Sequence, residues 1–206
     1  METGSRVDVY LFFSFDLVGS SRVKAQKFDR FHWGELFRYF HSECRRHIVS
    51  RGIENAVVWK YQGDEILFYQ RIETAYQVEH TIRAMDRTLG ALTRELAESA
   101  KYAAAAEHLQ VRALAWIAPV LSFAENVPEK MSALVAELEK LDLLTGDQMF
   151  HDRENSILDF LGPNIDTGFR LAGSARPERI TISNELADFL RGSDRPILDA
   201  IIAAGS

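Results

Sequence analysis

The sequence contains a single cysteine, Cys44, which excludes an internal disulfide and any cysteine-based zinc site. It has no apolar stretch of the length that a membrane helix needs, because the run from Tyr10 to Phe15 is short and ends at Asp16. That run does not read as a signal peptide either, so we expect a cytoplasmic protein without a membrane partner. Internal repeats, low-complexity tracts and linkers rich in proline or glycine are also lacking.

Positive charge is in the minority. The chain has 24 Lys and Arg against 30 Asp and Glu, for a net charge of -6. This balance disfavours general electrostatic binding to nucleic acid, although a local basic pocket for a small phosphate ligand is compatible with it. The 47% hydrophobic residues, with 13 Phe, 6 Tyr and 3 Trp, are enough to form a core and exclude a mainly disordered chain. The length of 206 residues suits one domain, residues 1–206.

Hydrophobic periodicity predicts an alternation of strands and helices. The expected elements are a strand at 7–15, a polar turn at 16–21, a helix at 28–50, a hairpin of strands 56–61 and 65–70, a helix over 75–96, a strand region at 109–123 broken by Pro119, helices at 132–144 and 164–172, a strand at 179–183 and a helix at 184–190. This order predicts an α+β fold of the ferredoxin-like, split-βαβ kind, with an antiparallel sheet and helices packed on one face.

Two aspartates stand where burial alone would not put them. Asp16 ends the first apolar strand, and Asp64 lies at the tip of the predicted hairpin. The first strand and the hairpin can be sheet neighbours, so the two carboxylates can face each other and hold a hard divalent cation such as Mg²⁺ or Mn²⁺. The alternative is that Asp16 caps the next segment and Asp64 is an ordinary turn residue.

Further candidates are a small polar loop and a predicted helix. Gly19, Ser20 and Ser21 offer backbone N–H groups and hydroxyls that can cradle phosphates, although a plain loop has the same composition. Asp166 and Arg170 are four residues apart, so on a helix they share one face. They can form a surface ion pair, or Arg170 can reach a phosphate while Asp166 orients it or the sugar.

Three blocks together resemble the catalytic domain of class III nucleotidyl cyclases. The first is Phe15 to Ser21, which resembles the first strand and metal loop of that family. The second is Lys60 to Asp64, which resembles the hairpin with a base-reading lysine and the second metal aspartate. The third is Asp159 to Arg170, which resembles the segment with a base-reading acid and the catalytic arginine. The blocks occur in the family's order and anchor most of the chain.

The resemblance implies a role for each candidate. Asp16, the Leu17 carbonyl and Asp64 would hold two divalent ions, Mg²⁺ or Mn²⁺, and Gly19, Ser20 and Ser21 would contact the phosphates. Lys60 and Asp159 would read the base, and Arg170 with Asp166 would act in catalysis. The implied reaction is attack of the ribose 3′-hydroxyl on the α-phosphate with release of pyrophosphate. The family also implies a homodimer with the site at the interface.

This chain differs from the family at two positions of the third block, and it lacks a lysine that the family has near the C-terminal end of the domain. Asp166 replaces an asparagine, Gly168 replaces an alanine, and no lysine follows Lys140 where the family has one after its last strand. The form of Asp166 to Arg170 resembles most the pyrimidine cyclases of bacterial antiphage defence (Pycsar systems). That narrower resemblance implies a cyclic UMP or cyclic CMP signal, read by a separate cyclic-nucleotide-binding effector.

The chemistry of the base-reading pair leaves the nucleobase open. Lysine donates and aspartate accepts, and all four bases offer a matching edge to Lys60 and Asp159. Selection of a pyrimidine requires something to fill the space of a purine, for which Tyr61, Phe68, Tyr69 and Phe169 are candidates. Resemblance alone favours UTP, then CTP.

Two other functions and one other cluster remain to be weighed. An adenylate or guanylate cyclase, or a catalytically silent nucleotide-binding module, would share most of these features.

His41, Cys44 and His47 are spaced by three residues on one predicted helix. Side chains at this spacing diverge around the helix, which disfavours a metal ion shared by all three.

Overall fold

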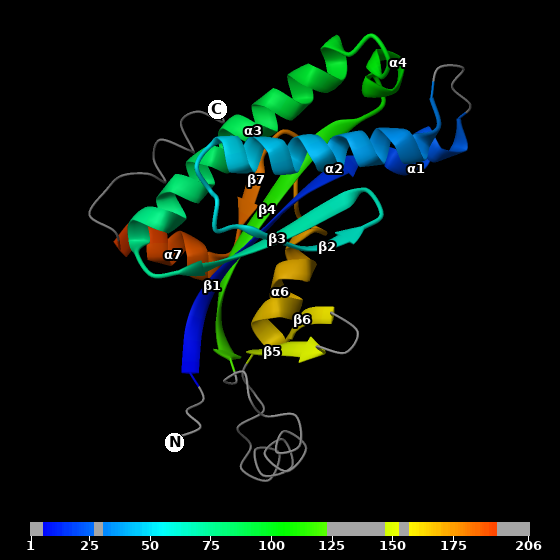
Figure 1. Cartoon of the computed structure of the whole chain (residues 1–206). Coiled ribbons are helices and arrows are strands. Elements are labelled where there is room, and N and C mark those ends of the chain that lie inside the picture. The colour runs from blue at the N-terminus through cyan, green and yellow to red at the C-terminus, as the bar shows by residue number, and fades with distance from the viewer. Residues whose placement is uncertain (1–5, 27–30, 123–146, 153–156, 193–206) are drawn as a thin grey trace.

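The computed structural model describes residues 6–26, 31–122, 147–152 and 157–192, and the elements within them are shown in Figure 1. The strands are β1 (Arg6–Val18), β2 (Val57–Gln62), β3 (Glu65–Ile72), β4 (Gln110–Ser122), β5 (Asp147–Asp152), β6 (Ile157–Leu161) and β7 (Ile180–Ile182). The helices are α1 (Ser20–Ala25), α2 (Trp33–Ser50), α3 (Ala75–Glu98), α4 (Ala103–Ala106), α6 (Pro163–Leu171) and α7 (Asn184–Gly192).

All of these strands belong to one sheet. The order is β2-β3-β1-β4-β5-β6, and β7 pairs with β4 beside this path. The prediction of an α+β fold with helices packed on a sheet is confirmed. The sheet is nevertheless mixed, because β5 and β7 both run parallel to β4 while the other pairs are antiparallel.

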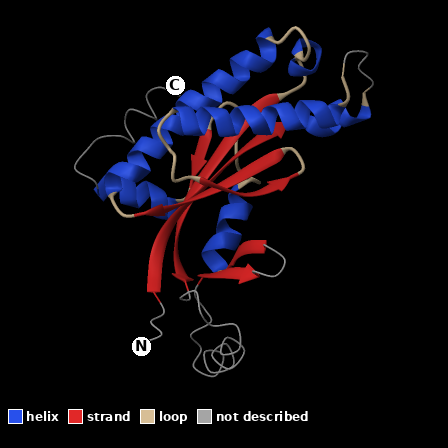
Figure 2. Ribbon diagram, viewed as in Figure 1, coloured by secondary structure: helices blue, strands red, loops and turns tan. Residues whose placement is uncertain are grey.

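The sheet has a buried core on each face, which corrects the prediction that helices cover one face only. Helices α2, α3 and α7 cover the first face, over the side chains of Leu11, Phe13 and Phe15 from β1. Helix α6 covers the second face (Figure 2). There Phe12 and its neighbours form an aromatic cluster. Side chains alternate along a strand, so β1 supplies both cores from consecutive residues.

The two long helices begin where local capping stops the chain from continuing as a strand or loop. Thr74 caps α3 by accepting from the Gln77 N–H, and the Gln77 side chain accepts in return from the Thr74 N–H at 3.0 Å. Helix α2 begins at Trp33, whose N-terminal neighbour His32 accepts from the Gly34 N–H. The predicted helix from 28 is thus too long, and α1 is a separate helix before it.

Three further predictions need correction. The predicted polar turn at 16–21 is wrong, because β1 continues through Val18 and α1 starts at Ser20. Strand β4 is not broken at Pro119, which pairs with Val9. Pro119 has no N–H to donate, and the strand tolerates this because neither neighbour pairs with residue 119: β7 pairs with β4 before it, and β5 pairs with β4 after it. Strands β5 and β6 were not predicted, and the predicted helix at 132–144 lies outside the described residues.

Candidate active site

The candidate site lies on the second face of the sheet, around Asp16 near the end of β1. In the strand register Asp16 stands directly between Glu65 of β3 and Arg112 of β4, so the three side chains form a row across the sheet. Arg112 Nε donates to Asp16 Oδ2 at 2.6 Å, and Arg112 Nη1 donates to the Ala172 carbonyl at 2.8 Å. This arginine therefore links the carboxylate to the end of α6.

The second aspartate of the site, Asp64, stands at the tip of the β2–β3 hairpin. The turn needs Gly63, whose φ of 66° lies in the left-handed region. Lys24 Nζ of α1 lies 3.9 Å from Asp64 Oδ1, at the long end of an ion pair. The charge of Asp64 is close enough to act on Asp16, which places both predicted metal ligands at the same end of the sheet.

Burial and neighbouring negative charge make Asp16 and Glu65 costly to ionise. Burial raises the pKa of Asp16, and the Asp64 charge adds to this, while Arg112 opposes it. Burial raises the pKa of Glu65 as well, and Asp16 and Asp64 add to this. Carboxylate oxygens are the donors that Mg²⁺ and Mn²⁺ prefer, although the oxygens of Asp16, Asp64 and Glu65 do not all lie within 4.8 Å of one another in this structure. A bound cation would remove the repulsion that Arg112 and Lys24 only partly offset.

The loop of Gly19, Ser20 and Ser21 follows β1 directly and forms the start of α1. Gly19 has a φ of 91°, and a Cβ there would lie 2.2 Å from the His108 carbonyl oxygen, so only glycine fits. Ser20 is buried and Ser21 is exposed. The N–H groups of a first helical turn lack partners within the helix, which leaves them available to an acceptor such as phosphate. The Leu17 side chain packs in the first core, so only its backbone can serve the site.

Lys60 and Asp159 are neighbours although they are 99 residues apart in the sequence. Lys60 Nζ donates to Asp159 Oδ1 at 3.2 Å. The side chains are 34% and 38% exposed, so a ligand can reach both. The structure thus brings together the two residues for which base reading was predicted.

Asp166 and Arg170 are both exposed on α6, and no contact joins their side chains within the described residues. The surface ion pair, which was the alternative interpretation of this spacing, is therefore not formed. Phe169, between them and the core, packs against Trp59 and Trp116. The guanidinium of Arg170 remains open to a ligand or to a second subunit.

The glycine at position 168 is explained by packing. A Cβ there would lie 2.1 Å from Cε2 of Trp116, a side chain that is 2% exposed. Helix α6 can therefore approach β4 only because residue 168 has no side chain. The large indole of Trp116 takes the volume that an alanine would need.

Sequence reasoning missed Glu65, Arg112 and Trp59 as residues of this site. Glu65 and Arg112 face Asp16 only because of the strand register, to which local periodicity gives no access. Trp59 donates its indole N–H to Asp159 Oδ1 at 3.0 Å across 100 residues of sequence. The one available signal was that Trp59 directly precedes the predicted base-reading lysine.

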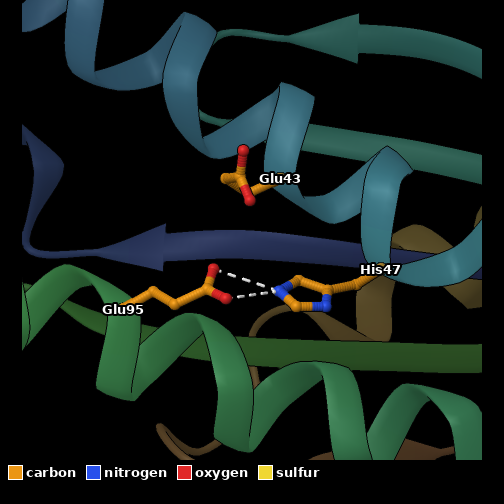
Figure 3. Close-up of side chains that lie close together, drawn as sticks. All are labelled: Glu43, His47 and Glu95. Atoms are coloured by element: carbon orange, nitrogen blue, oxygen red, sulfur yellow. Dashed lines mark hydrogen bonds and ion pairs between the residues drawn. The ribbon is translucent and has the colours of Figure 1, made fainter. Parts of the chain in front are cut away.

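A second polar cluster, Glu43, His47 and Glu95, lies between α2 and α3 on the other side of the sheet (Figure 3). Its ligand atoms lie within 4.8 Å of one another. Arg51 Nη1 lies 2.7 Å from His47 Nδ1, while His47 Nε2 lies 3.0 Å from Glu95 Oε1 and 3.1 Å from Arg46 Nη2, so side chains of the protein already contact both ring nitrogens.

An arginine also occupies this second cluster. Arg46 Nε donates to Glu43 Oε2 at 2.6 Å, and Arg46 Nη2 donates to Glu95 Oε1 at 3.0 Å. The positive charge that the two glutamates require is thus supplied by the chain itself. The cluster is an ion-paired network that holds α2 against α3. Cys44, in the same turn of α2, is fully buried and faces the core.

The fold is shared with solved structures of nucleotidyl cyclases. The adenylyl cyclase CyaB from P. aeruginosa matches with a TM-score of 0.58 and 11% identity, over 92% of this chain and 84% of that chain. The guanylate cyclase domain of RhGC from Catenaria anguillulae in complex with GTP matches with a TM-score of 0.59 and 11% identity, over 90% and 83%. The catalytic core of a rhodopsin-guanylyl cyclase in complex with ATPαS matches with a TM-score of 0.59 and 13% identity, over 93% and 86%.

These likenesses establish that the chain has the fold of a class III cyclase catalytic domain. No protein-family model matches the sequence, and no curated protein matches it. None of the described helices is both long and apolar enough to cross a membrane.

Proposed function

We propose that this chain is a nucleotidyl cyclase that converts a pyrimidine nucleoside triphosphate, UTP before CTP, to the 3′,5′-cyclic monophosphate and pyrophosphate. The observation that carries the proposal is that, in a cyclase fold, the Asp64 charge acts on Asp16 and Lys60 bonds to Asp159. The first pair suits metal-assisted phosphoryl chemistry, and the second suits the edge of a base.

The residues of the chain divide the work of binding and positioning. Asp16, Asp64 and the Leu17 carbonyl would hold two divalent ions, Mg²⁺ or Mn²⁺, which would activate the ribose 3′-hydroxyl and neutralise the triphosphate. The N–H groups at Gly19 and Ser20 and the Ser21 hydroxyl would bind the phosphates.

The exposed face of α6 would complete the site. In the reaction the O3′–Pα bond forms and the bond from Pα to the pyrophosphate oxygen breaks. Arg170 would stabilise the charge that develops on the α-phosphoryl oxygens, with Asp166 orienting it or the ribose. Both side chains point away from the core, which supports a site shared between two subunits of a homodimer.

The biological role in the proposal rests on the resemblance of Asp166 to Arg170 to the pyrimidine cyclases of antiphage defence. The cyclic pyrimidine nucleotide would be a second messenger, read by a separate effector.

One competing function is a catalytically silent nucleotide-binding module. The ion pairs of Asp16 with Arg112 and of Asp64 with Lys24 favour it, because these cations already partly neutralise the proposed metal ligands.

The test is incubation of the purified protein with UTP, CTP, ATP and GTP in Mn²⁺, with the products resolved by mass spectrometry. Asp64→Ala should abolish product formation, while Asp188→Ala, at an exposed carboxylate of α7, should leave it unchanged. A cyclic pyrimidine product supports the proposal. A cyclic purine product would retain the cyclase and overturn the pyrimidine preference, and no product from any nucleotide would favour the silent module.

A further inference from the structure

Arg112 is shared between two partners that lie on different elements. Its Nε donates to Asp16 Oδ2 of β1 at 2.6 Å, and its Nη1 donates at 2.8 Å to the carbonyl of Ala172, the residue that caps the end of α6. Asp16 is only 8% exposed, and an ion pair that is shielded from water is held more strongly than an exposed one. The arginine therefore ties a proposed metal ligand to the helix that carries Asp166 and Arg170.

A divalent cation at the same carboxylates would meet this arginine. The charge of Arg112 acts on Asp16 and also on Glu65, which pairs with Asp16 across the sheet. A cation bound to Asp16 would lie within a few ångströms of the guanidinium, and like charges at such a separation repel strongly where little water screens them. The ion and the arginine therefore compete for the charge of Asp16.

The end of α6 gives Arg112 a second place to bind. The carbonyls just before it accept from backbone N–H groups, because Ala172, Gly173 and Ser174 each donate to the residue three positions earlier. Arg112 takes the next carbonyl, that of Ala172, and the C-terminal end of a helix favours a cation. The arginine can thus leave Asp16 without becoming a buried charge that has no partner.

We propose that Arg112 is an internal counter-ion of Asp16, that a divalent cation displaces it from this carboxylate, and that the end of α6 then holds it. Arg112 is thus a positioning residue that sets the metal affinity of Asp16 and couples metal binding to α6. This inference rests on the proposed function in one respect, namely that Asp16 binds a divalent cation. It goes beyond it by naming the residue that opposes this binding and the helix that responds to it.

The first test measures metal affinity in the absence of nucleotide. Mn²⁺ alone is titrated into the chain, the free ion is counted by electron paramagnetic resonance, and the binding that is lost in Asp16→Ala identifies the site. Arg112→Gln removes the positive charge, so it should bind Mn²⁺ at least about tenfold more tightly than the wild type. Arg112→Lys keeps the charge, and its affinity should stay within about threefold of the wild type.

Arg71→Gln is the matched control, because it removes a similar ion pair from the same sheet. Arg71 Nε of β3 lies 3.1 Å from Asp8 Oδ1 of β1, near the opposite end of β1 from Asp16. This variant loses one positive charge, as Arg112→Gln does, but at a distance where solvent and salt screen it from the metal. Its affinity for Mn²⁺ should therefore equal that of the wild type.

Thermal unfolding distinguishes a counter-ion from a residue that is only structural. Without metal, Arg112→Gln leaves the buried Asp16 carboxylate without its cation, so Tm should fall below that of the wild type. Mn²⁺ binds the variant more tightly, so it should raise the Tm of Arg112→Gln by more than it raises that of the wild type. A loss of Tm that is equal with and without Mn²⁺ would overturn the inference.

The outcomes separate this inference from the proposed function. Tighter Mn²⁺ binding by Arg112→Gln, with no cyclic product from the wild-type chain, would overturn the cyclase and leave the role of Arg112 standing. Cyclic product from the wild type, with equal or weaker Mn²⁺ binding by Arg112→Gln, would retain the cyclase and overturn the role of Arg112. Absence of Mn²⁺ binding by both chains would also overturn that role.

A measurement on the wild-type chain covers the case in which Arg112→Gln does not fold. In the ¹⁵N-labelled protein, saturation with the diamagnetic ion Mg²⁺ should speed the exchange of the Arg112 Nε–H with water, because this group leaves Asp16. The Gly173 N–H belongs to the same peptide group as the Ala172 carbonyl, so its resonance should shift as the arginine moves fully to that carbonyl. An Nε–H that keeps its slow exchange, or a Gly173 resonance that does not shift, would overturn the inference.

Discussion

Replacing Gly168 by alanine tests whether the absence of a side chain at residue 168 allows α6 to pack closely on β4. In a helix interior this substitution by itself stabilises by about 0.8–1.0 kcal/mol, because alanine restricts the unfolded chain more than glycine does. At residue 168, however, the new Cβ would lie 2.1 Å from Cε2 of Trp116, more than an ångström closer than ordinary contact. The expected sign therefore depends on whether Trp116 can move.

The surroundings of Trp116 indicate that it cannot move cheaply. Its ring stacks on Phe12 with centroids 5.4 Å apart and an interplanar angle of 15°, and it also contacts Phe169. Overpacking of such a core costs about 1–3 kcal/mol, and we place this site at the upper end. The net loss is then about 2 kcal/mol, which in a chain of this length lowers Tm by about 4–8 °C.

Thermal unfolding followed by circular dichroism measures the effect, and Gly90→Ala is the matched control. Gly90 is exposed within α3, and a Cβ there meets nothing within 4 Å, so this variant should gain stability where Gly168→Ala loses it. In a Trp116→Leu background the additional cost of Gly168→Ala should disappear. The reasoning is refuted if Gly168→Ala has the same or a higher Tm than the wild type.

Three other predictions concern the metal site and the helices on the first face. Mn²⁺ at about a hundred times its Kd should stabilise the wild type by about 2.7 kcal/mol, and this gain should be absent in Asp64→Ala; an equal gain in the variant would sink the metal assignment. Burial raises the pKa of Glu95, but the hydrogen bond from His47 and the charge of Arg46 outweigh burial and lower this pKa below the unfolded value of 4.5. The ionised Glu95 therefore stabilises the folded state above pH 4.5, and this stabilisation is lost as the pH falls through the lower pKa of the folded state. Glu95→Gln should accordingly lower Tm at pH 7 by about 2–4 °C, for a loss of about 1 kcal/mol, and the difference from wild type should vanish in acid; a pH-independent difference would contradict the ionic origin. Thr74→Ala removes the side-chain cap of α3 and should cost about 1 kcal/mol with unchanged product formation, and a stability equal to that of wild type would show that the cap is not used.

The sequence determined those features in which a residue's environment follows from its neighbours along the chain. Side chains alternate in a strand and recur every three to four residues in a helix, so apolar spacing predicted β1, the β2–β3 hairpin, α2 and α3 to within a few residues. Motif order likewise singled out Asp16, Asp64, Lys60 and Asp159 before their positions in space were known. Secondary structure and motif order depend on residues that are close in the sequence, so patterns in the sequence are enough to predict them.

Tertiary structure decided which of these residues meet. Arg112 reaches Asp16 across 96 residues of sequence, and Trp59 reaches Asp159 across 100, because strand register and one β-bulge set which side chains share a face. The same holds for the parallel strands beside β4 and for the contact between Gly168 and Trp116. The same strands and helices could pair and pack in many ways that satisfy their local propensities equally well. Strand pairing and core packing select one of these arrangements, because their free energy comes from contacts between segments, which the sequence of a single segment does not specify.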